Sequence, residues 1–260
     1  MNPLQRILIE KTGNDSGFEH VLVSNVNGVT LASALHANRA MIELDGAVYY
    51  VRFQTMSASL LPELKRSFSL PPGTDYFPVI SEAELAKLLR RAASLSRSLP
   101  SQAANDYEQA VVSELAELPV GVAGTEVERI VRQRVGQNKY REAMLDYWGG
   151  ACAVTGVAIS QVLRASHAKP WAECTTDSER LDVFNGFLLC ANLDALFDRF
   201  LISFDEHGLL IISSQLAGVE DLQRLGITPE MRLRWVTPQH QFYLVHHRLQ
   251  FTNIQTNQCI

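Results

Sequence analysis

The sequence lacks the features that would place the chain in a membrane, in a secreted class or around a cysteine-bound zinc ion. It has four cysteines, and no two of them form a C-x-x-C pair, which argues against a cysteine-rich zinc site. The N-terminal residues have no apolar signal-peptide core, and no apolar run is long enough to span a bilayer. We therefore expect a cytoplasmic protein with reduced thiols and no membrane segment.

The chain also lacks the positive surplus of a protein that binds polyanions over its whole surface. Its 260 residues include 23 Lys and Arg against 28 Asp and Glu, which gives a net charge of -5. A nucleic-acid site would therefore have to be a local patch on an acidic protein. The hydrophobic fraction of 47% is sufficient for a sizeable core, and the length allows two modest domains.

Residues 1–100 have the pattern of a small β-rich α+β domain. Short apolar runs such as "RILIE", "HVLVSNV", "RAMIEL" and "AVYYVRFQ" predict strands, and Asp45-Gly46 predicts a tight turn between two of them. Ser81 followed by Glu84 then predicts a capped amphipathic helix. The crowded aromatic residues could line a pocket for an extruded base, although core packing is the simpler interpretation for Tyr49, Tyr50, Phe53, Tyr76 and Phe77.

The middle of the chain predicts a linker over residues 101–124, where "PSQAAND" begins and "PVGVAG" ends a stretch that includes one short helix, "YEQAVVSELAEL". Thr125 with Glu128 predicts a second capping box and the start of a long helix that Gly149-Gly150 would end. We therefore expect a second domain over residues 125–260, closed by a helical extension at "TPQHQFYLVHHRLQF".

A lone histidine, His167, stands in "RASHAKPWAEC", with nothing within five residues to complete a metal cage and no serine elbow or cysteine partner beside it. The surrounding order is a strand with His167, a loop, the start of a strand with Asn185, and a helix with Asn192. This is a ββα unit that presents one His and two Asn side chains. Taken singly, Asn185 could belong to an ordinary turn, and Asn192 could be a helix N-cap. Trp171 is expected to pack and fix the turn after the histidine.

Successive blocks of this region, "RQRVGQNKYREAMLDYWGGACAVTG", "ASHAKPWAE", "DSERLDVFNGFLL" and "NLDALFDRFLISFDEHG", resemble the HNH endonuclease family over about residues 125–210. The resemblance implies a ββα-metal fold in which His167 is the general base, Asn185 orients it and Asn192 binds the metal ion. Ser166 occupies a position that is often a metal-binding Asp or His. Oxygen ligands would favour Mg²⁺ or Mn²⁺.

Two carboxylates lie near Asn192 on the same predicted helix. Asp198 is six residues away and does not share a face with Asn192 well, so we expect at most a supporting role for it. Asp194 is two residues away and is expected to point elsewhere.

Basic residues concentrate before and around the histidine. Residues 129–171 contain seven basic residues and two acidic ones, a local surplus of five on an acidic chain. A solvated helix face would explain this, but next to a nuclease site we expect contacts with DNA phosphates. The predicted DNA-binding residues are Arg134, Gln137, Arg141, Arg164 and Lys169.

The sequence thus predicts an α+β protein with a C-terminal metal-dependent DNA endonuclease domain, and the resemblance suggests restriction or anti-phage defence. Duplex cutting usually needs two active sites, which favours a homodimer. Two other hypotheses stay open at this point. One is a non-catalytic DNA-binding module with a decayed metal site, and the other is a nuclease gated by an N-terminal ligand- or partner-sensing domain.

Overall fold

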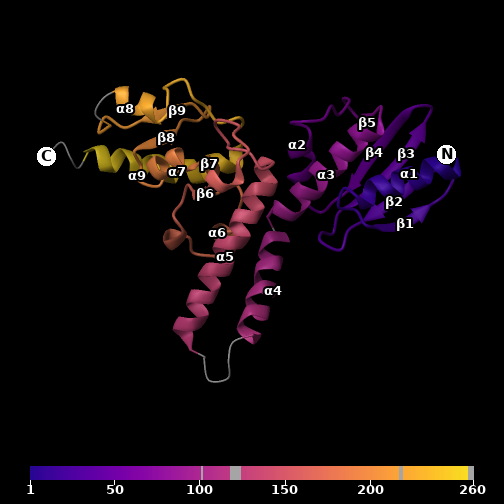
Figure 1. Ribbon diagram of the computed structural model, residues 1–260, viewed down its shortest axis with the longest axis horizontal. Helices are drawn as coiled ribbons and strands as arrows, with labels where there is room; N and C mark the ends of the chain where they lie inside the picture. The colour runs from indigo at the N-terminus through magenta and orange to yellow at the C-terminus, as the bar shows by residue number, and fades with distance from the viewer. Residues whose placement is uncertain (101, 118–123, 217–218, 257–260) are drawn as a thin grey trace. The chain divides into compact units, whose positions relative to one another are not determined.

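The computed structural model describes residues 1–100, 102–117, 124–216 and 219–256, without the side chains of residues 219 and 254–256. The chain divides into two compact units, Met1–Gln102 and Ala103–Ile260 (Figure 1). Both combine helices with sheet, so the predicted α+β class is confirmed. None of the described helices is both long and apolar enough to cross a membrane.

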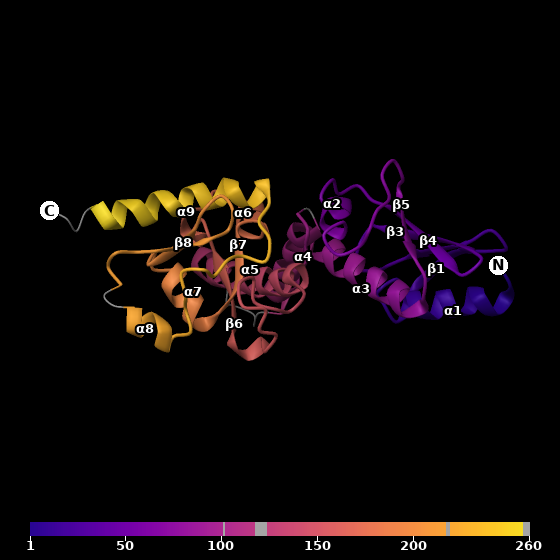
Figure 2. The ribbon, with the colours of Figure 1, turned by 90° about the horizontal axis from the view of Figure 1, so that it is seen from above.

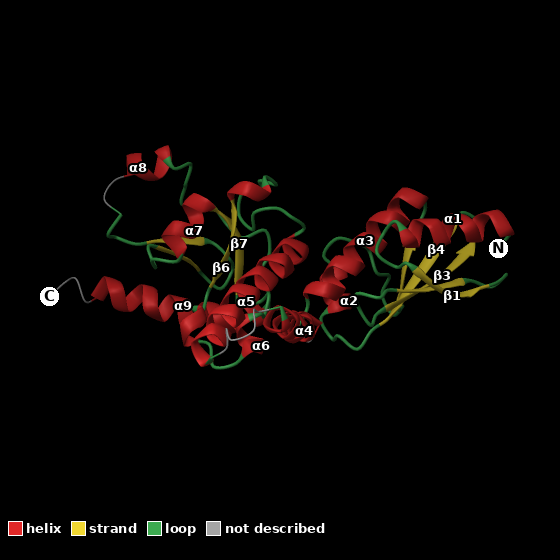
Figure 3. Ribbon diagram, turned by 60° about the horizontal axis from the view of Figure 1, so that its bottom comes forward, coloured by secondary structure: helices red, strands yellow, loops and turns green. Residues whose placement is uncertain are grey.

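The first unit is a five-stranded antiparallel sheet in the order β1-β2-β3-β4-β5, covered on one face by helices α1 and α3 (Figures 2 and 3). Asp45 pairs with Val48 across the β3–β4 turn, so the predicted hairpin is confirmed. The elements are α1 (Pro3–Asn14), β1 (His20–Ser24), β2 (Val29–Ala32), β3 (Arg39–Asp45), β4 (Val48–Gln54), α2 (Leu60–Leu64), β5 (Tyr76–Val79) and α3 (Glu82–Ser98).

Helix α1 corrects one sequence-based expectation, because "RILIE" lies in this helix and is not a strand. The Asn2 side chain accepts a hydrogen bond from the Gln5 amide, the Gln5 side chain accepts one from the Asn2 amide, and Pro3 starts the helix. This capping box and the fixed φ of proline favour a helix over a short apolar strand. The predicted start of α3 is confirmed, since the Ser81 side chain accepts a bond from the Glu84 amide.

The aromatic residues of the first unit lie on both faces of the sheet. Phe53 and Phe77 are buried in the core, 8% and 0% exposed. Tyr50 and Tyr76 are half-buried on the other face and meet edge to face at 5.0 Å. Core packing therefore explains the two phenylalanines, and they line no base pocket.

The second unit begins with a pair of helices, α4 (Gln102–Ala116) and α5 (Thr125–Trp148). The Tyr107 hydroxyl on α4 donates to the Arg132 carbonyl on α5 at 3.3 Å, so most of the stretch predicted as a linker is a packed helix (Figure 1). Residues 118–123, most of "PVGVAG", lie outside the described residues. Helix α5 has Gly124 as its N-cap with no side-chain cap bond, so the predicted Thr125 capping box is wrong, whereas the predicted end at Gly149 is confirmed.

The rest of the second unit contains the predicted ββα arrangement. Strand β6 (Leu163–His167) pairs antiparallel with β7 (Gly186–Cys190), and α7 (Ala191–Phe197) follows directly. Strands β8 and β9 pair antiparallel, and α9 packs on β7 and β8 (Figure 2). The remaining elements are two short 3₁₀ turns at Ser160–Val162 and Trp171–Glu173, and α6 (Asp177–Arg180), β8 (Ile202–Phe204), β9 (Leu210–Ile212), α8 (Val219–Arg224) and α9 (Pro238–Thr256).

Candidate active site

A cavity of about 500 Å³ opens beside the ββα unit. Its walls come from α5, β6, the turn that follows β6, and the helix α7 with its C-terminal cap. The lining includes Gln137, Tyr140, Arg141, Arg164, His167, Trp171, Asp194 and Asp198. The cavity therefore combines an imidazole, two carboxylates and two guanidiniums, a set that can bind a phosphodiester and activate water.

His167 ends strand β6 and is held on three sides. Its Nε2 lies 2.8 Å from the carbonyl oxygen of Arg180, and a carbonyl can only accept, so Nε2 carries the proton. The ring stacks on Tyr140 with centroids 3.8 Å apart and an interplanar angle of 20°. The Trp171 ring stands nearly perpendicular to it, at 5.8 Å and 88°. This tautomer leaves Nδ1 with a free lone pair.

The environment of His167 keeps its ring neutral. Burial lowers the pKa of His167 to about 4, and the hydrogen bond to the Arg180 carbonyl opposes that shift. At neutral pH the imidazole is therefore in the form that accepts a proton. An anionic phosphate entering the cavity would stabilise the imidazolium and move the pKa back towards neutrality.

Asn185 is fully buried, and its side chain bonds to backbone groups near both ends of the loop after β6. Its Oδ1 accepts the Lys169 amide at 2.8 Å, and its Nδ2 donates to the carbonyls of Lys169 at 3.2 Å and Glu179 at 3.1 Å. This loop ends at Arg180, whose carbonyl accepts the hydrogen bond from His167 Nε2. Asn185 is thus connected to the histidine through the loop, and the orienting role stays a prediction.

The glycine after Asn185 is required by the close approach of two strands and a helix. Gly186 has φ +153°, and a Cβ there would lie 1.9 Å from the Ser166 carbonyl oxygen and 2.4 Å from the Tyr140 hydroxyl. That hydroxyl donates to the Asn185 carbonyl at 2.9 Å. Tyr140 therefore both stacks on His167 and fixes the Asn-Gly turn, and any side chain at position 186 would displace it.

Neither residue predicted to bind metal lines the cavity. Ser166 is 1% exposed, and its hydroxyl donates to Asp194 Oδ1 at 2.6 Å, so it reaches the cavity only through that carboxylate. The Asn192 amide donates to the Leu225 carbonyl at 2.7 Å. Asn192 is the second residue of α7 and is not among the residues that line the cavity, so its metal-binding role stays a prediction that this cavity does not support.

Asp194 and Asp198 both line the cavity, whereas Asn192 does not. Asp194 thus points away from Asn192, as expected, but towards the site. The two carboxylates are four residues apart, a spacing that puts two side chains on one helix face, and this signal was visible in the sequence. Burial, together with the charge of Asp194, raises the pKa of Asp198 to about 6.

These two carboxylates are the donors that the protein offers to a cation. Among the described residues there is no group of three or more His, Cys, Asp or Glu side chains that could hold a metal ion. Two carboxylates sharing a partly buried wall repel each other when both are ionised, and a divalent cation would relieve that repulsion. Their hard oxygens suit Mg²⁺ or Mn²⁺, with phosphate and water as the remaining ligands.

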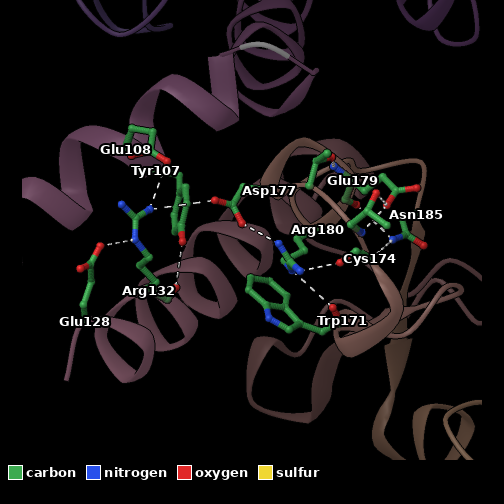
Figure 4. A network of polar contacts seen from close by, with 12 residues as sticks. Tyr107, Glu108, Glu128, Arg132, Trp171, Cys174, Asp177, Glu179, Arg180 and Asn185 are labelled. Carbon is green, nitrogen blue, oxygen red and sulfur yellow. Dashed lines mark hydrogen bonds and ion pairs between the residues drawn. The ribbon is translucent and has the colours of Figure 1, made fainter. Parts of the chain in front are cut away.

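The loop between Lys169 and Arg180 is locked by charged contacts that sequence reasoning missed (Figure 4). The Arg180 guanidinium donates to Asp177 at 2.8 Å and to the Trp171 carbonyl at 3.4 Å, and it lies 5.7 Å from the centre of the Trp171 ring. Lys169 pairs with Glu179 at 2.8 Å. The pair of Asp177 with Arg180 has the local i,i+3 spacing of a helix, whereas the contacts of Arg180 with Trp171 and of Lys169 with Glu179 depend on the loop folding back on itself.

The predicted DNA-binding residues divide into two groups. Gln137, Arg141 and Arg164 line the cavity, and Arg141 also donates to the carbonyls of the turn before β6 and of its first residue, at 2.9 and 2.6 Å. Arg134 and Lys169 are instead paired with carboxylates, Arg134 with one on α4 and Lys169 within its own loop. The local positive surplus is therefore partly neutralised by acidic residues outside the counted stretch.

Residues 152–205 match the family model HNH_2, described as HNH endonuclease. No curated protein is significantly similar to the chain. The matched segment contains the strand with His167, the Asn-Gly turn and the helix with Asp194, and it leaves out α5 and α9. Residues 152–205 are therefore similar to HNH endonucleases, and this matched segment carries the histidine and both carboxylates of the cavity.

Proposed function

We propose that the protein is a metal-dependent endonuclease that hydrolyses phosphodiester bonds in DNA. An HNH endonuclease domain implies DNA as substrate, and HNH nucleases generally use a divalent metal ion. One observation carries the proposal: a neutral His167, fixed by the Arg180 carbonyl and the Tyr140 ring, lines the same cavity as two carboxylates. A decayed, purely DNA-binding module would have no need of this combination.

In the proposed reaction, Nδ1 of His167 accepts a proton from water as the water oxygen attacks phosphorus. The bond from phosphorus to the 3′-oxygen breaks, the leaving oxygen takes a proton from solvent water, and the products are a 5′-phosphate and a 3′-hydroxyl. The resulting imidazolium keeps its Nε2–H bond to Arg180 and its stack on Tyr140, so the ring need not move. General base catalysis of this kind contributes roughly 10²–10⁴-fold. The guanidiniums of Arg141 and Arg164 at the cavity would bind phosphate oxygens.

Asp194 and Asp198 would hold the divalent cation, and the hydroxyl of Ser166 would orient Asp194. When bound, such an ion supplies positive charge to the scissile phosphate and the leaving oxygen. The donor set fits, because both carboxylates lie on one face of α7 and line the cavity that His167 lines. Mg²⁺ or Mn²⁺ is the expected ion.

We further propose that the first unit, Met1–Gln102, recognises DNA or a partner and that the enzyme serves in restriction or phage defence. The support is the resemblance of the second unit to a bacterial subfamily found among restriction endonucleases, together with the separate core of the first unit. Sensing of a ligand or partner by this unit is the alternative. The homodimer expected for duplex cutting has no support in the described residues.

Nicking of supercoiled plasmid in MgCl₂ or MnCl₂ tests the proposed reaction. The wild type should nick, EDTA should stop the reaction, and His167→Ala should lower the rate by at least about 100-fold. His207→Ala is the matched control, because the His207 side chain is 76% exposed and lies outside the cavity. Equal rates for His167→Ala and the wild type, or no nicking by the wild type with either metal, would overturn the proposal.

A further inference from the structure

A second cavity, of about 610 Å³, lies in the second unit between α4, the first half of α5 and the locked loop. It shares Trp171 with the first cavity, so one indole forms part of both walls. Figure 4 shows its polar side, where Tyr107 of α4 and Arg132 of α5 approach Asp177 and Arg180 of the loop. Nothing in the proposed reaction uses this space.

The charges that line the second cavity are already paired. Arg132 bonds to Glu128 at 2.9 Å and to Glu108 at 3.3 Å, and Arg180 bonds to Asp177 at 2.8 Å. A phosphate placed here would meet carboxylates as well as guanidiniums, so the lining does not select an anion. Paired charges beside two aromatic rings instead suit a neutral planar group that carries both hydrogen-bond donors and acceptors.

A glutamine amide in this lining has no partner among the described residues. It belongs to Gln133, which lines the second cavity and is exposed. Four residues later on α5, Gln137 lines the first cavity, likewise without a bond in the described part of the chain. Between them Gly136 lets the Trp171 ring pack onto the helix. Helix α5 thus offers one free amide to each cavity, with the indole between them.

We propose that the second cavity binds a base of the DNA substrate, extruded from the strand beside the phosphate that is cut in the first cavity. The half-buried Trp171 would contact the ring, and Gln133 would read its hydrogen-bonding edge, as glutamine amides do with adenine. Stacking on aromatic side chains offsets part of the cost of unstacking a base. This inference rests on the proposed nuclease function, because it takes the substrate to be DNA.

The test that does not depend on cleavage uses 2-aminopurine, a fluorescent adenine analogue, placed at successive positions of an oligonucleotide. With wild-type protein in EDTA, we expect the fluorescence to change at one position only. Gln133→Ala should weaken or abolish that change. The matched control, Asn138→Ala, removes an exposed amide of the same helix that lines neither cavity, and it should keep the change. Bound DNA with no positional change in fluorescence would overturn the inference.

The second test compares the cut sites of the variants in a random-sequence library. The wild type should show a preference of about 5- to 150-fold for one base at a position beside the cut, the range for a single well-read base. Gln133→Ala should flatten that position, and Asn138→Ala should keep it. Identical cut-site preferences in the wild type and Gln133→Ala would overturn the inference and leave the nuclease function standing. If the wild type cuts no DNA, the nuclease function fails, and the fluorescence result alone supports or overturns base binding.

Discussion

Replacing Gly136 with alanine sets two effects of known size against each other. Alanine is favoured over glycine in a helix interior by about 0.8–1.0 kcal/mol. However, a Cβ at position 136 would lie 2.3 Å from Cη2 and 3.0 Å from Cζ2 of Trp171. To reach an ordinary contact the indole must retreat by about 1 Å, and overpacking of this kind costs about 1–3 kcal/mol. Gly136→Ala should therefore leave the free energy of unfolding lower by about 0–2 kcal/mol.

The displaced indole should also disturb the chemistry. Trp171 stands 5.8 Å from the His167 ring and 5.7 Å from the Arg180 guanidinium, and the Arg180 carbonyl holds the histidine proton. A shift of about 1 Å in a positioning group can lower a rate about 100-fold. We therefore expect Gly136→Ala to reduce plasmid nicking by one to two orders of magnitude without unfolding the protein.

The decisive measurement is the same substitution in a Trp171→Ala background, followed by denaturant unfolding monitored by circular dichroism. Without the indole the steric penalty disappears, so Gly136→Ala should now stabilise the protein by about 1 kcal/mol. The sign of the effect should thus reverse between the two backgrounds. A stabilised Gly136→Ala single variant that nicks at the wild-type rate would refute the reasoning, because the indole would then not be a fixed wall.

The remaining predictions concern the metal, pH and the first unit. Asp194→Asn should raise the Mg²⁺ or Mn²⁺ concentration needed for half-maximal nicking at least about tenfold, whereas Asn192→Ala should leave it unchanged. Burial lowers the pKa of His247 to about 4, so the unfolded protein binds one more proton than the folded protein between about pH 4 and pH 6.5. The free energy of unfolding therefore falls as the pH drops through that range. In His247→Gln the slope of the free energy of unfolding against pH should be smaller by about 1.4 kcal/mol per pH unit. Deleting the first unit should leave a folded fragment that still nicks DNA, and a comparison of its cut sites with those of the full chain shows whether that unit supplies specificity.

The ββα unit could be predicted because its signals are local. Alternating residues end in His167, a turn pair follows at Asn185-Gly186, and a helix comes next, and the structure reproduces that order. The carboxylates were missed for a different reason. Their spacings from Asn192, two and six residues, do not indicate a shared face, whereas Asp194 and Asp198 are four residues apart and do share one.

Other features could not have been found in the sequence, since they arise from residues that are distant along the chain. The charge count over the basic stretch included Arg134 and Lys169 but omitted Glu114 and Glu179, which neutralise them in the fold. A charge count over one stretch of sequence cannot identify ion-pair partners that lie elsewhere in the chain. In the same way, the Arg180 carbonyl can accept the hydrogen bond from His167 only because the loop folds back to the end of β6.

The matched segment, residues 152–205, does not hold its histidine in place by itself. The ring stacks on Tyr140 of α5, and the Tyr140 hydroxyl fixes the Asn-Gly turn. At the same cavity, His247 of α9 stacks on Phe197 at 3.8 Å and bonds to its carbonyl at 3.1 Å, at the end of the helix that carries the carboxylates. A fragment cut to the matched segment would lose both supports and expose the apolar surfaces that they cover. The smallest fragment expected to cut DNA therefore begins no later than α5 and retains α9.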